Sequence, residues 1–111
     1  MTPEEREKFY DDEVAPVLLD LARKCHANGI SFVADVEWEP GESGTTTLLA
    51  EPHSFSIEMS AICARANNNA DAMIMHMMRY ARERGHSSIC LGQLGVPYTP
   101  SPAQQTPNPS T

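Results

Sequence analysis

Residues 30–39 read ISFVADVEWE, and this stretch decides the fold class because its residues alternate in character with a period of two. Apolar residues occupy the even positions from Ile30 to Trp38, and three of the odd positions are acidic. Successive side chains of a β-strand point to opposite faces, so the pattern predicts a strand with one buried and one charged face. The turn formers of residues 40–44 follow, and residues 45–50 resume as a second strand. Together they predict a β-hairpin.

The segment before this hairpin is predicted to be a helix that begins at Thr2 and ends near Gly29. Thr2 and Glu5 form a T-x-x-E capping box, and apolar residues recur at helical spacing behind it. Pro16 lies inside the pattern and cannot donate the helical hydrogen bond to the carbonyl four residues earlier. We therefore expect a kink near Asp12.

The segment after the hairpin carries apolar residues at three- and four-residue spacing from Met59 to Ala81, without loss of phase. This periodicity predicts one long second helix from about residue 57 to Arg84. The asparagines at positions 67–69 are weak helix formers, so the alternative is two helices, with Asn69 capping the second.

Residues 87–91 form a short apolar run that predicts a third strand, which gives an α+β fold with the order α-β-β-α-β. A right-handed crossover through the long helix would place this strand beside the first, antiparallel to it. We expect a three-stranded antiparallel sheet with two helices on one face. The other face would carry Asp35, Glu37 and Glu39.

The 111-residue chain is long enough for one domain, which we place at residues 1–98. Residues 99–111 consist of Pro, Ser, Thr, Gln, Asn and a single Ala, which predicts a disordered Pro-rich tail. No stretch approaches the ~20 apolar residues of a membrane span, and the N-terminus lacks the pattern of a signal peptide. We expect a cytoplasmic protein with no membrane association.

The net charge of −7 is unevenly distributed along the chain. Residues 1–58 hold thirteen acidic and four basic side chains, whereas residues 59–111 hold two acidic and four basic ones. Direct nucleic-acid binding requires Lys and Arg to neutralise phosphates, so this composition argues against it.

Patterns typical of catalysis or of a bound cofactor are missing from the sequence. The four His and three Cys residues show no C-x-x-C, H-x-x-x-H or H-E-x-x-H spacing, and no phosphate-binding glycine loop precedes a helical pattern. We therefore expect a protein that is not an enzyme and has no cofactor. The alternative is a metal-dependent hydrolase, because Asp35 and Glu37 share a strand face and could both reach one Mg²⁺.

Three groups of residues are candidates for binding. The acidic row of Asp35, Glu37 and Glu39 would project at ~7 Å intervals, close to the spacing of successive phosphates, so it is either a DNA-like partner surface or a solvated face. Met75 and Met78 on the second helix suggest a protein interface, with a homodimer as its simplest form. A basic cluster follows at the end of the same helix and consists of Arg79, Arg82, Arg84 and His86. Either these cations interact favourably with the helix dipole, or they form an anion site. An anion site would make the protein a sponge that binds an anionic nucleotide.

Residues 17–22, 31–34 and 81–88 read VLLDLA, SFVA and ARERGHSS, and in these segments the chain resembles small uncharacterised phage and prophage proteins. The resemblance covers about residues 5–96 and carries over no activity or site residues. It implies a binding role, because short phage accessory proteins often act by blocking host machinery. We therefore expect a small binding protein with a protein partner, such as a phage-encoded inhibitor of host defence or regulation in the host cytoplasm.

Overall fold

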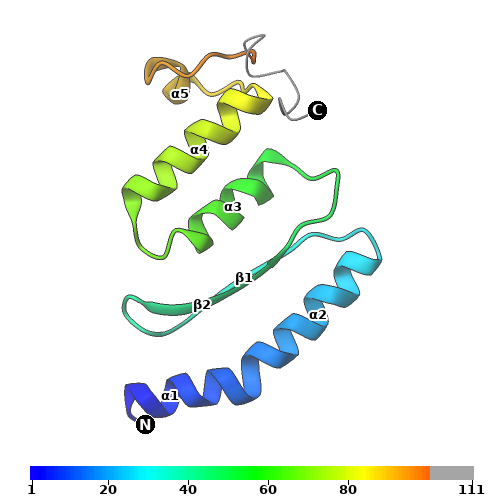
Figure 1. Cartoon of the computed structure of the whole chain (residues 1–111), viewed down its shortest axis with the longest axis vertical. Helices are drawn as coiled ribbons and strands as arrows, with labels where there is room; N and C mark the ends of the chain where they lie inside the picture. Colours follow the sequence, from blue (N-terminus) through cyan, green and yellow to red (C-terminus); the bar gives the residue numbers. More distant parts are fainter. Residues whose placement is uncertain (101–111) are drawn as a thin grey trace, which may run out of the picture. The chain divides into compact units, whose positions relative to one another are not determined.

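The computed structural model describes residues 1–100 and confirms the α+β class, with a long N-terminal helix, an antiparallel hairpin and then further helices (Figure 1). The chain divides into two compact units. The N-terminal unit comprises Met1–Asn69, and the C-terminal unit begins at Ala70. A single domain over residues 1–98 stays a prediction. Residues 101–111, most of the predicted tail, lie outside the described residues.

The N-terminal helix consists of α1 (Pro3–Phe9), a π-helical turn η1 (Tyr10–Val14) and α2 (Ala15–Ala27). The predicted capping box is present, since Thr2 Oγ1 accepts from the Glu5 amide and Glu5 Oε1 accepts from the Thr2 amide. Pro16 lies in the first turn of α2, directly after the π-helical turn. The wider turn accommodates a residue that cannot donate its hydrogen bond, and the helix changes direction there, as expected (Figure 1).

The hairpin consists of β1 (Phe32–Glu39) and β2 (Glu42–Leu48), joined at Pro40 and Gly41. Gly41 has a φ of +87°, a left-handed conformation that glycine adopts without a steric penalty. Val33 lies opposite Thr47, Asp35 opposite Thr45 and Glu37 opposite Ser43. The register then shifts between Glu37 and Glu39, so that a β-bulge at Trp38 interrupts the regular pairing.

The hairpin has helices on both faces, which corrects the prediction of helices on one face only. Tyr10 of the N-terminal helix is 7% exposed and packs against Trp38, whose ring centroid is 5.0 Å away, on the face of the even-numbered β1 residues. On the opposite face, Arg65 at the end of α3 (Phe55–Arg65) donates through Nε to Thr47 Oγ1 at 3.1 Å. Figure 1 shows the hairpin between these two helical segments of the N-terminal unit.

The predicted three-stranded sheet is wrong. Within residues 1–100 the sheet contains β1 and β2 alone, and the apolar run expected as a third strand belongs to α5 (Ile89–Gln93). Ser88 accepts a hydrogen bond from the Leu91 amide at 3.1 Å and so caps this short helix. A serine just before an apolar run is a helix-start signal, and here it overrides the strand propensity of the run.

The predicted long second helix is also wrong, because the structure has two helices here, as in the alternative; the cap by Asn69 stays a prediction. After α3 the chain turns, and a separate helix, α4, spans Ala70–Arg84. Asn67 and Asn68 have φ values of 51° and 65°. This left-handed conformation ends an α-helix, and Asn adopts it more readily than most residues. Apolar spacing indicates which side chains are buried, but it does not report backbone hydrogen bonding. An unbroken spacing can therefore span the turn between two separate helices.

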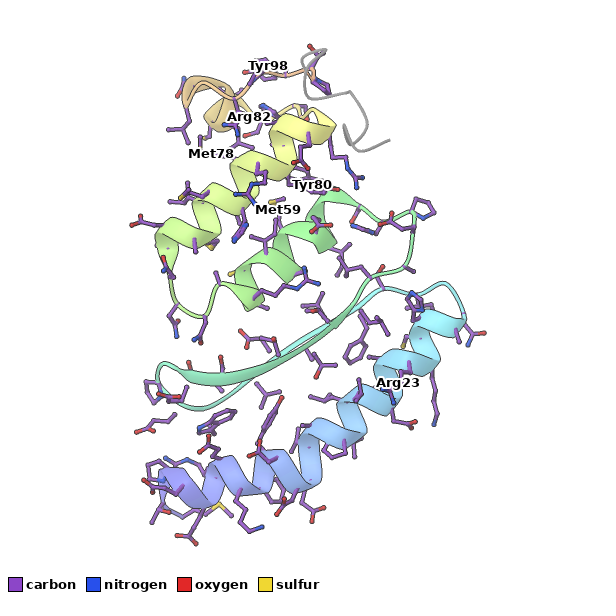
Figure 2. The ribbon with its side chains drawn as sticks, viewed as in Figure 1. Arg23, Met59, Met78, Tyr80, Arg82 and Tyr98 are labelled. Atoms are coloured by element: carbon purple, nitrogen blue, oxygen red, sulfur yellow. The ribbon has the colours of Figure 1, made fainter. Side chains whose placement is uncertain are left out.

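The C-terminal unit is held together beyond α4 by contacts around Val96 and Tyr98. Val96 is 1% exposed, and the His86 amide donates to the carbonyl of Tyr98 at 3.0 Å. Figure 2 shows Tyr98 beyond the C-terminal end of α4. Gly85 has a φ of +80° and ends α4 where the sequence predicts that the helix closes.

Candidate functional site

Asp35 and Glu37 lie on the hairpin face that also carries Val33, whereas the register places Glu39 with Glu42 on the other side of the bulge. Asp35 and Glu37 are alternate residues of β1, and both are exposed. Glu39 follows the β-bulge, is partly buried and lies opposite Glu42. The structure therefore brings Asp35 and Glu37 together on one sheet face, whereas the bulge interrupts the regular spacing before Glu39.

The carboxylates of the hairpin form no salt bridge within residues 1–100, although Arg6 binds the Trp38 carbonyl and Arg65 binds Thr47 nearby. These carboxylates are those of Asp35, Glu37, Glu39 and Glu42. Glu37 Oε2 accepts a hydrogen bond of 3.4 Å from the Gly41 amide. The N-terminal unit as a whole holds thirteen acidic and five basic side chains. Its hairpin face therefore presents local negative charge within a negatively charged unit.

The predicted partner residues on α4 differ in exposure. Met75 is 62% exposed, whereas Met78 is partly buried. Arg79 is exposed and Arg82, three residues later, is partly buried, so these two arginines share one flank of the helix. Figure 2 shows Met78 and Arg82 on α4.

The other two members of the basic cluster have partners within the C-terminal unit. The guanidinium carbon of Arg84 lies 5.2 Å from the centroid of the Tyr80 ring, a cation–π contact. His86 Nδ1 accepts from the Ser88 amide at 3.0 Å, and His86 Nε2 faces the Val96 carbonyl at 3.0 Å. Both ring nitrogens of His86 are therefore engaged within the C-terminal unit, so an anion at this cluster would depend on Arg79 and Arg82.

His53 and Glu58 form a pair that the sequence analysis missed. His53 Nε2 lies 2.6 Å from Glu58 Oε1, and His53 Nδ1 lies 2.9 Å from the Ala50 carbonyl. The His53 side chain is 4% exposed. The hydrogen bond to Glu58, followed by that to Ala50, raises the pKa of His53 above its ordinary value of 6.5. The signal in the sequence is a histidine directly before Ser54, the cap of α3, with Glu58 in the first turn.

The His53–Glu58 pair ties the segment after β2 to the first turn of α3. No group of three or more His, Cys, Asp or Glu side chains within the described part of the chain is arranged so that it could hold a metal ion. Within residues 1–100, none of the helices combines the length and apolar character needed to cross a bilayer.

Comparisons with models of protein families, with curated proteins and with solved structures find no match to this chain.

Proposed function

We propose that the chain is a non-enzymatic binding protein that acts through a protein interface on the acidic hairpin face, which we define by Asp35 and Glu37. The observation that carries the proposal is the exposure of these two carboxylates on one face, with no salt-bridge partner in residues 1–100. Uncompensated charges close together repel one another, and a basic partner surface would relieve this repulsion. Complementary charge also accelerates the encounter of two proteins.

The partner that this face fits is a protein surface rich in Lys and Arg, such as one that binds nucleic-acid phosphates. The net charge of −7 supports this choice, because it disfavours an acidic partner and nucleic acid itself. The resemblance to phage and prophage proteins supports a specific form of the proposal. In that form the protein is a phage-encoded inhibitor that occupies the basic surface of a host defence or regulatory protein in the host cytoplasm.

A nucleotide sponge is the second candidate, because Arg79 and Arg82 share one flank of α4. The two candidates use different units of the chain and opposite charges. Replacement of both arginines by Gln should abolish nucleotide binding without affecting a protein partner of the hairpin. A metal-dependent hydrolase at Asp35 and Glu37 would instead be stabilised by Mg²⁺ in a thermal-shift assay.

Affinity capture from host extract, with the full chain as bait, tests the proposed function. The test bait carries Asp35→Asn and Glu37→Gln, and the control bait carries Glu4→Gln and Glu7→Gln, which remove the same charge from exposed positions of α1. A specific partner should be captured by wild type and control but not by the test bait. Equal capture by all three baits would refute the proposed face.

A further inference from the structure

The two edges of the hairpin differ in how well they are protected against pairing with another strand. The edge of β1 carries a bulge at Trp38, and the Trp38 carbonyl accepts a hydrogen bond from Arg6 Nε at 2.7 Å. Strand β1 also carries Asp35 and Glu37. Bulges and charged residues are common devices that prevent edge-to-edge association.

Strand β2 has fewer of these devices, since Arg65 of α3 binds the Thr47 side chain but the strand itself is regular and nearly uncharged. Its sequence is ESGTTTL, which contains no proline, no lysine and no charge after Glu42. In residues 1–100, no backbone hydrogen bond links β2 to any segment other than β1. Because every second residue of a strand directs its N–H and C=O away from its partner, β2 presents a row of free donors and acceptors.

We propose that a second copy of the chain docks on this edge through antiparallel pairing of β2 with β2. The pairing would extend the hairpin into a four-stranded sheet with the order β1-β2-β2-β1. This inference does not rest on the proposed function, and it assigns the second copy to an edge of the sheet rather than to the methionines of α4.

The sequence of β2 is compatible with itself about a two-fold axis at Thr45, the central residue of the strand. In that register Thr45 faces its own copy, Ser43 faces Thr47 and Glu42 faces Leu48. Pairs of Thr and Ser are favourable across antiparallel strands, and no two like charges meet. Self-pairing of β1 about a two-fold axis at Val36 would instead place Asp35 opposite Glu37, and both are acidic. Self-pairing is therefore favoured at β2 and disfavoured at β1.

Helix α2 supplies apolar surface beside the same edge. It lies mainly against β2, and a two-fold axis perpendicular to the sheet would place both copies of α2 on one face, on either side of the new junction. Val17 and Leu21 on one flank of α2 are 63% and 45% exposed, and Leu19 on the other flank is 42% exposed. Whichever flank faces the junction therefore contributes apolar side chains to it.

Disulfide trapping tests the geometry directly. In a full chain with Cys63→Ser and Cys90→Ser, which replace the two exposed cysteines, Thr45→Cys should form a disulfide-linked dimer under mild oxidation. Directly opposed residues of antiparallel strands have Cα atoms about 4.5–5.5 Å apart, within the range of a disulfide. The control is Asp35→Cys, which lies opposite Thr45 in the hairpin and is also exposed. Its two copies would be separated by three strand spacings, about 14 Å, and should not cross-link.

Light scattering of the unmodified chain supplies the second measurement. We expect twice the chain mass of 12.2 kDa, and Thr45→Glu should return the protein to a monomer with an unchanged circular dichroism spectrum. A wild-type monomer at submillimolar concentration would overturn the proposal. So would equal cross-linking of Thr45→Cys and Asp35→Cys, or a dimer that Met75→Lys dissociates and Thr45→Glu does not. Each of these results leaves the charge-dependent capture of a partner unaffected, so the two proposals fail independently.

Discussion

The ring of Tyr10 lies directly over Gly44. A Cβ atom on Gly44 would be 2.5 Å from the Tyr10 hydroxyl oxygen and 2.6 Å from two carbons of its ring, far inside van der Waals contact. Tyr10 belongs to the π-helical turn and Gly44 to β2, and the same ring also packs on Trp38 of β1. The absence of a side chain at Gly44 therefore allows the N-terminal helix to pack against both strands of the hairpin.

Gly44→Ala should destabilise the chain by about 1–3 kcal/mol, the usual cost of forcing an extra carbon into a packed site. Without this contact, Ala in place of a strand glycine would be neutral or stabilising, because glycine loses more conformational entropy on folding. Urea unfolding followed by circular dichroism measures the free energy of unfolding. The double variant with Tyr10→Leu provides the control, since the cost of Gly44→Ala should shrink once the ring is removed. An equal cost in both backgrounds would contradict the account.

The pH dependence of stability should reflect the clip between His53 and Glu58. The folded state raises the pKa of His53, chiefly through its hydrogen bond to Glu58, so folding favours the protonated imidazole. This stabilisation is fully present below the pKa of the unfolded state, near 6.5, and is lost as the pH rises through the folded value. NMR titration of the His53 ring should give a pKa above 6.5.

Glu58→Gln is the matched variant for this prediction. It keeps the shape of the side chain and removes the charge, so the pKa of His53 should fall toward its ordinary value. The loss of stability as the pH rises above 6.5 should become smaller. A His53 pKa at or below 6.5 in the wild type would show that the clip does not bind the protonated ring.

Asn68→Ala should lower the free energy of unfolding by about 1 kcal/mol, because Asn68 has a φ of 65° and alanine resists that conformation. Asn68→Gly should be neutral or slightly stabilising. If the chain instead formed one continuous helix here, alanine would stabilise it and glycine would destabilise it. The order of the two variants in thermal unfolding therefore distinguishes a turn from a helix.

The hairpin and the first helix could be predicted from sequence because their signals are local and consistent. The alternation of residues 30–39 and the capping box at Thr2 each specify one structure. The missed features depend on backbone conformation or on distant contacts. The left-handed asparagines broke a helix whose apolar spacing was unbroken, and the cap at Ser88 turned a predicted strand into a helix.

The candidate site was predictable in part. Alternation alone placed Asp35 and Glu37 on one face, and both are exposed there. It could not predict the bulge at Trp38, because the carbonyl of that residue is bound by Arg6, which is 32 positions away. The pair of His53 and Glu58 was missed because its spacing of five residues matches none of the metal-binding motifs that the sequence was compared with.

We propose above that the acidic hairpin face binds a basic protein surface. Calorimetric titration of the captured partner with the full chain tests it most directly, with the Asp35→Asn and Glu37→Gln double variant measured beside the Glu4→Gln and Glu7→Gln control. We predict that the hairpin variant raises Kd at least about tenfold, which corresponds to 1.4 kcal/mol, while the control stays near wild type. Equal weakening in both variants would mean that binding follows net charge. No weakening in the hairpin variant would mean that another surface binds the partner. Either result would contradict binding through the acidic hairpin face.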